Sequence, residues 1–212
     1  KVFGLIEKNL HNCENIIIIG SFLEMGFDFK DLDILLINSK SMDKPSEKQS
    51  INRIADKIET EIGTKAHILS INSYGLRRGL ARDPLYENML SKCASKNRMV
   101  FNIKRVIDCQ ILDAHLLKSK DLFANYSVFN GREKYYLVKN MISILLFLDG
   151  EKINSKNIEK RIQSEFKIGI EEIKENLLDK NNFLKNYKRC YNKTFNLIMN
   201  YTRGRKIENG SE

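Results

Sequence analysis

The stretch NIIIIGSFLEMGFDFKDLDILLI, residues 15–37, decides the fold of the first part of this chain. An apolar run typical of a buried strand ends at Gly20-Ser21, and a second apolar run begins with Asp31-Leu32-Asp33. Because the side chains of a strand alternate between its two faces, Asp31 and Asp33 project from one face while Leu32 points to the other. The two strands therefore bring a small-residue turn and two carboxylates toward one place.

These residue types suit a nucleotide and a divalent cation. Mg²⁺ binds one or two carboxylates together with the phosphates of a substrate. Gly20 lets the backbone approach a ligand closely, and a helix that starts after it aims free N–H groups at phosphate oxygens. A Gly-Ser after a strand is usually only a turn, and paired aspartates are often solvated. The combination at this spacing is the more specific signal.

Strand and helix signals alternate through the first hundred residues. Helices are predicted at 1–10 and, from an N-cap at Ser46, at 46–62, with a short helical turn at 22–25. Strands are predicted at 15–19, 32–37 and 66–71. A basic loop with Arg77, Arg78 and Arg82 follows, and then a helix from Pro84 to about Cys93. This order of elements predicts an α/β first part.

Strand signals stop beyond about residue 103. Helical periodicity is found at 106–118, 132–148, 155–166, 170–178 and 181–201. Five helices with short breaks predict an all-α helical bundle. We therefore expect two domains, residues 1–103 and residues 104–212.

Composition is that of a soluble globular protein. The 212 residues are 42% apolar and 30% charged. The apolar runs at 16–19 and 141–148 are too short to cross a bilayer, and residues 1–10 lack the apolar core of a signal peptide. The four cysteines lack zinc spacing and indicate reduced thiols. We expect a cytoplasmic protein without a membrane partner, and the oligomeric state stays open.

Basic residues are concentrated in the second half. Residues 1–103 carry a net charge of +2, residues 104–212 carry +7, and the 27 positions from 180 to 206 contain no acidic residue. Such a patch attracts RNA or other polyanions, and we take Lys185, Lys188, Arg189 and Lys193 as candidate contacts. The aromatic residues between them are explained most simply as core packing, with stacking on bases as the alternative.

The first half resembles the polymerase beta nucleotidyltransferase superfamily, especially its minimal nucleotidyltransferase branch. The resemblance rests on a strand, Gly20-Ser21, about ten residues, and then Asp31 and Asp33 opening a second strand. It covers roughly residues 1–102 and extends to AHILSINSYGLRRGLARDPLYENMLSKC, which is similar to the third strand and following helix of the family. It implies an α/β (α+β) core with a mixed sheet.

The resemblance also implies an activity. Ser21 and the backbone after Gly20 would hold the triphosphate of ATP or another NTP, and Asp31 and Asp33 would hold Mg²⁺ or Mn²⁺ against it. One metal would neutralise the triphosphate and another would activate an acceptor hydroxyl, so that a nucleoside monophosphate is transferred and pyrophosphate leaves. The acceptor expected from the basic second half is RNA.

One position departs from the family pattern. Members usually carry a third carboxylate on the third strand, but TKAHILSIN contains none, and His67 takes the expected place. A neutral imidazole can accept a proton but cannot supply the negative charge of a carboxylate. Glu24, Asp28 and Asp83 are the nearest other carboxylates in the motif region.

Two hypotheses follow. The chain is a metal-dependent nucleotidyltransferase in which His67 takes the third place of the site. Alternatively, it is a catalytically degenerate relative that binds nucleotide, RNA or a partner protein as a regulator. His67 is the residue that separates them.

Overall fold

The computed structural model describes residues 1–10, 13–23, 31–39 and 45–208. The chain divides into two compact units. The sheet unit holds residues 1–81 and 89–104, and the helical unit holds residues 82–88 and 105–212. Residues 82–88 thus belong to the helical unit, although they precede the predicted domain boundary between residues 103 and 104. That domain boundary stays a prediction.

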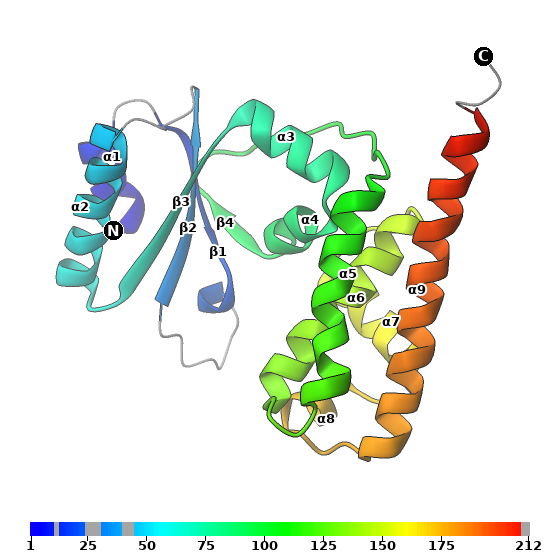
Figure 1. Cartoon of the computed structure of the whole chain (residues 1–212). Coiled ribbons are helices and arrows are strands. Elements are labelled where there is room, and N and C mark those ends of the chain that lie inside the picture. The colour runs from blue at the N-terminus through cyan, green and yellow to red at the C-terminus, as the bar shows by residue number, and fades with distance from the viewer. Residues whose placement is uncertain (11–12, 24–30, 40–44, 209–212) are drawn as a thin grey trace. The chain divides into compact units, whose positions relative to one another are not determined.

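The sheet unit contains a mixed sheet, as predicted (Figure 1). Its strand order is β3-β2-β1-β4. β2 runs antiparallel to β1 and parallel to β3, while β4 pairs antiparallel with β1. The bounds are β1 (Cys13–Ile19), β2 (Asp31–Asn38), β3 (Lys65–Asn72) and β4 (Cys93–Ser95).

Two helices cover one face of this sheet (Figure 1). They are α1 (Val2–Asn9) and α2 (Pro45–Ile62), and α2 makes the crossover that the parallel pair of β2 and β3 requires. Apolar residues of α2 recur at helical spacing, and Ile54 and Ile58 are buried against the sheet. Gly63, with a φ of +75°, follows the last turn of α2 in the left-handed conformation that glycine favours.

Alternation along the strands decides which residues face these helices. Leu32 and Ile34 of β2 and Ala66 of β3 are buried in the core cluster with α1 and α2. Because neighbouring side chains point to opposite faces, Asp31 and Asp33 project from the other face of the sheet. The period of two read from the sequence is thus confirmed.

The basic segment after β3 is a helix, so the prediction of a loop there was wrong. α3 (Ser73–Arg82) begins after Asn72, whose side-chain oxygen accepts a hydrogen bond from the Gly75 N–H at 2.6 Å. This is an N-cap contact, and Leu76 is fully buried, which fixes the first turns of the helix.

Two other elements differ in detail from the expectation. The predicted turn at 22–25 begins as the 3₁₀ helix η1 (Ser21–Leu23), and its last two residues lie outside the described residues. β4 was not predicted, because its three residues lack the β-branched and aromatic side chains that mark a strand. The helix after Pro84 is α4 (Pro84–Leu90).

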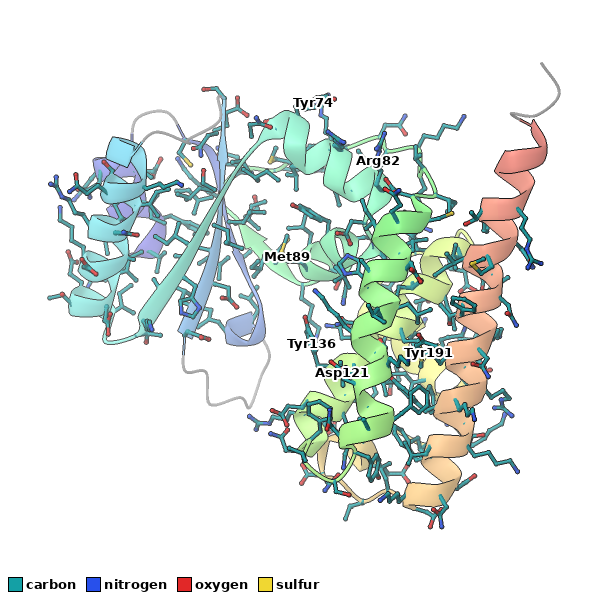
Figure 2. The ribbon with its side chains drawn as sticks, in the orientation of Figure 1. Tyr74, Arg82, Met89, Asp121, Tyr136 and Tyr191 are labelled. Carbon is teal, nitrogen blue, oxygen red and sulfur yellow. The ribbon has the colours of Figure 1, made fainter. Side chains whose placement is uncertain are left out.

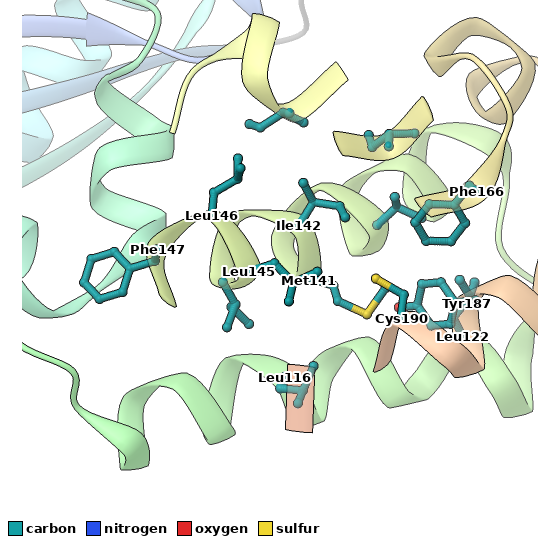
Figure 3. Close-up of a cluster of buried hydrophobic side chains, with 14 of the residues drawn as sticks. Leu116, Leu122, Met141, Ile142, Leu145, Leu146, Phe147, Phe166, Tyr187 and Cys190 are labelled. Carbon is teal, nitrogen blue, oxygen red and sulfur yellow. The ribbon is translucent and has the colours of Figure 1, made fainter. Parts of the chain in front are cut away.

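The helical unit is a bundle, as predicted. Its central helix is α6, whose residues 141–148 are all buried. Figure 3 shows Met141, Leu145 and Leu116 in this core. The bounds are α5 (Cys109–Asn125), α6 (Gly131–Leu148), α7 (Ser155–Phe166), α8 (Ile170–Lys174) and α9 (Lys180–Glu208).

The first half of the aromatic stripe of α9 lies in the core rather than on the surface. Phe183 and Tyr187 are buried, and the Tyr187 hydroxyl donates to the Ser119 carbonyl at 2.8 Å. Phe123 packs edge-on against Tyr187 at 5.2 Å between ring centroids. Burial raises the pKa of the Tyr187 hydroxyl well above its usual value. The core-packing interpretation therefore holds for these rings.

Within the described part of the chain, none of the helices combines the length and the apolar character that a membrane span requires. All four cysteines are free thiols.

Candidate functional site

The parallel pairing of β2 and β3 brings the three predicted side chains together. Asp33 lies opposite His67 in the strand register. The His67 Nδ1 atom lies 3.5 Å from an Asp31 carboxylate oxygen and 3.7 Å from an Asp33 carboxylate oxygen. All three side chains are between 38% and 49% exposed, so a ligand in solvent can reach them.

Gly20 lies against the Asp33 carboxylate. Ile19, the last residue of β1, pairs with Asp33, and Gly20 follows it with a φ of +87°. A Cβ atom on Gly20 would lie 2.7 Å from Asp33 Oδ2. Backbone conformation and space both favour glycine at this position. The Gly20 carbonyl then accepts a hydrogen bond from Leu23 N–H at 3.3 Å, closing the turn of η1.

The two carboxylates repel each other. Burial, and then the charge of Asp31, raise the pKa of the Asp33 carboxyl above its usual value, and the nearby His67 offsets part of this increase. The protein groups around Asp33 therefore do not fully offset the cost of its negative charge. A cation bound between the carboxylates would relieve this repulsion.

The donor set fits Mg²⁺ or Mn²⁺ only with help from a substrate. In the described residues, no three His, Cys, Asp or Glu side chains form a group that would hold a metal ion by themselves. Two carboxylates completed by phosphate oxygens and water are a usual environment for Mg²⁺. Asp31 and Asp33 are therefore the residues that would hold the metal.

Of the other carboxylates in the motif region, Asp83 is the one that the structure describes. Asp83 lies in the helical unit, where its Oδ2 atom is 3.0 Å from Nε2 of His115. Glu24 and Asp28 lie outside the described residues. Among the described residues, His67 is thus the predicted side chain that lies beside Asp31 and Asp33, and its role stays a prediction.

Lys65 is a further candidate site residue, which the sequence reasoning missed. It lies opposite Asp31 in the register of β2 and β3 and is exposed. It precedes His67 by two residues, so the alternation of β3 places both on one face. That spacing was available in the sequence once His67 had been chosen. The side chain of Ser21 is not among those described, and its backbone begins η1.

The four candidate basic residues of α9 divide into two pairs. Lys193 Nζ lies 2.6 Å from Glu165 Oε1, and the Arg189 guanidinium donates to the Glu165 carbonyl at 2.8 Å. These two cations connect α9 to α7. Lys185 and Lys188 are exposed and form no ion pair with any side chain that the structure describes.

Comparison with solved structures gives a similarity to spectinomycin adenyltransferase AAD(9) from Enterococcus faecialis, solved with ATP and spectinomycin. The TM-score is 0.44 and the sequence identity is 16%, over 93% of this chain and 98% of that chain. Neither a protein-family model nor a curated protein matches the sequence.

Proposed function

We propose that this protein is a metal-dependent nucleotidyltransferase that moves a nucleoside monophosphate from an NTP to an acceptor hydroxyl. The observation that carries the proposal is the meeting of Gly20, two carboxylates and an imidazole on one exposed face of the sheet. A phosphate-binding turn beside a divalent-cation site is what a nucleoside triphosphate requires.

Each residue has a stated role. Asp31 and Asp33 would hold Mg²⁺, which when bound supplies positive charge against the triphosphate. The backbone after Gly20 and the Lys65 ammonium group bind phosphate oxygens. The acceptor oxygen attacks the α-phosphorus, the bond between the α-phosphorus and the bridging oxygen breaks, and pyrophosphate leaves. Positioning of the two reactants supplies much of the rate.

His67 takes the acceptor proton. Its Nδ1 atom faces the two carboxylates, so the Nε2 atom remains available to the acceptor hydroxyl. The imidazolium that forms would lie beside the Asp31 and Asp33 carboxylates. This arrangement replaces the proton acceptor, but not the metal ligand, that a third carboxylate would provide.

The direct test is transfer of label from each [α-³²P]NTP to pooled RNA and protein, with Mg²⁺ or Mn²⁺. We expect labelled acceptor with the wild-type protein and none with Asp31→Asn. If no acceptor is labelled but Asp31→Asn weakens NTP binding, the degenerate nucleotide-binding alternative replaces the enzyme. If Asp31→Asn leaves NTP binding unchanged as well, the site has neither role.

His67→Ala is expected to lower the transfer rate about 100-fold, because general-base catalysis contributes about that much or more. The Kd for the NTP should change little, since His67 acts on the acceptor. Adding imidazole to the His67→Ala protein should restore part of the rate, whereas His67→Gln, which cannot take the proton, should stay slow. A full rate in His67→Gln would contradict the assigned role.

We propose that Lys185 and Lys188 are the members of the predicted polyanion-binding set that remain open to an acceptor. Replacing both with Glu is expected to weaken heparin and RNA binding a few-fold at low salt, and less as salt screens the charges. Lys156→Glu with Lys160→Glu, on exposed positions of α7, is the matched control. Equal effects of the two pairs would show that the α9 lysines have no special role.

A further inference from the structure

The sheet unit carries a second basic surface that the site does not use. Its residues 73–81 and 89–104 contain six Lys or Arg residues and no Asp or Glu. Two of the six lie on α3, one directly precedes β4 and three follow it. They are Arg77, Arg78, Lys92, Lys96, Arg98 and Lys104. Lys96 pairs with Glu7, so its charge is partly compensated.

The structure places α3 and the segment 97–101 side by side. Glu14 contacts both: Ser73 Oγ donates to its carboxylate at 2.5 Å, and Asn97 Nδ2 donates to its carbonyl at 3.1 Å. Further along, the Arg77 guanidinium lies 5.9 Å from the centre of the Phe101 ring. Residues separated by more than twenty positions in the sequence therefore form one surface.

This surface exposes an aromatic ring among cations. Tyr74 is 73% exposed, and Figure 2 shows it on α3. Val100, on the adjacent segment, is 78% exposed. Arg77, Arg78 and Arg98 are exposed, and no carboxylate of the described residues forms an ion pair with Arg77 or Arg78. The ring has little packing role, and the arginines are free to bind anions.

We propose that this surface, formed by Tyr74, Arg77, Arg78 and Arg98 and called here the Tyr74 surface, binds a single-stranded nucleic acid. Arginines contact successive phosphates, and an exposed tyrosine stacks on an unpaired base. A duplex offers the phosphates but keeps its bases stacked inside, so the exposed ring favours a strand over a duplex. An acidic peptide would form ion pairs with the arginines, but it carries no base to stack on the tyrosine ring.

The position of the surface suits an acceptor strand. β3 carries His67 and ends at Asn72, where α3 begins, so five residues separate His67 from the start of α3. At strand geometry the six steps from His67 to Ser73 span about 20 Å. Naming the bound strand as the acceptor rests on the proposed function, whereas the binding itself does not.

The test measures fluorescence anisotropy of a labelled 20-nucleotide RNA strand without self-pairing and of the duplex with its complement. It uses the full chain without NTP or metal. We expect the strand to bind at least about five-fold more tightly than the duplex. Tyr74→Ala should remove this preference and Tyr74→Phe should keep it. Circular dichroism melting checks that each variant is folded.

The charge arm uses Arg77→Glu with Arg78→Glu. We expect about ten-fold weaker binding and a salt slope smaller by about 1.4, because two phosphate contacts are lost. Lys48→Glu with Arg53→Glu reverses the same charge at exposed positions of α2 and should change the affinity little. An unchanged strand-to-duplex ratio in Tyr74→Ala, or equal weakening by the two charge pairs, would overturn the proposal.

The outcome is separable from that of the proposed function. Asp31→Asn should bind the strand as the wild type does, because Asp31 is not part of the Tyr74 surface. Strand binding without nucleotidyl transfer would support the surface and reject the activity. Transfer that survives Arg77→Glu with Arg78→Glu at wild-type KM for RNA would show that the acceptor does not use this surface.

Discussion

Asp33→Asn is expected to lower nucleotidyl transfer by at least about a hundred-fold and to raise thermal stability at neutral pH. The rate falls because one of the two carboxylates that the proposed mechanism places against the triphosphate loses its charge, and groups that stabilise charge in a reaction contribute on this scale. Stability rises because ionised Asp33 is repelled by Asp31 and is partly removed from water. The gain should not exceed about 1 kcal/mol, since solvent screens both carboxylates.

The sign of the pH dependence follows from the raised pKa of Asp33. Between the usual Asp pKa and the raised value, the folded protein holds more protons than the unfolded chain, so the free energy of unfolding falls as pH increases. At pH values above the raised pKa, ionised Asp33 destabilises the folded protein to its full extent. The Tm advantage of Asp33→Asn should therefore be present at pH 7 and disappear in acid below both values.

A matched control separates this effect from the loss of any carboxylate. Asp56 is exposed on α2, so Asp56→Asn removes one charge far from the site face of the sheet. It should leave transfer near the wild-type rate. It should not give a Tm gain at pH 7 that disappears in acid. If Asp33→Asn lowers Tm at pH 7, the two aspartates are held by an interaction that outweighs their repulsion.

The proximity of most of the candidate site residues could be predicted from sequence because the information is local. Gly20 and Asp33 lie at the ends of two consecutive strands, and an antiparallel pair places those ends together. His67 required one further step, the parallel register of β3, which the buried Ala66 fixes by selecting the face. The helices of the second half followed from apolar periodicity alone.

The elements that the sequence analysis did not predict have two different causes. The tight N-cap contact of Asn72 that turns the expected basic loop into α3 is a local signal that was overlooked. By contrast, β4 exists because Cys93–Ser95 pairs with the edge of β1, and no side-chain pattern marks three such residues. The contact of Arg77 with Phe101 is likewise a product of the fold.

Gly131→Ala is expected to destabilise the helical unit by about 3 kcal/mol, the upper end of the usual range when a packed site is overfilled, because the clash is with rigid backbone. Gly131 is the first residue of α6, after an N-cap at Asn130 that exchanges hydrogen bonds with Glu133. A Cβ atom on Gly131 would lie 2.1 Å from the Lys174 carbonyl oxygen and 2.5 Å from that of Ile173. Both are backbone atoms and cannot rotate away.

Relief of this clash would have to move α8 or α6, and both are held by buried groups. Ile173 is fully buried, and the buried Lys134 ammonium donates to Asn176 at 2.6 Å just beyond α8. Gly169→Ala is the control, because its Cβ would meet only the flexible Glu172 carboxylate at 3.3 Å. Thermal melting should give a Tm lower by roughly 10 °C for Gly131→Ala and by a few degrees at most for Gly169→Ala. Equal shifts would mean that α8 can move at little cost. The close packing of Gly131 would then not be what fixes α6 against α8.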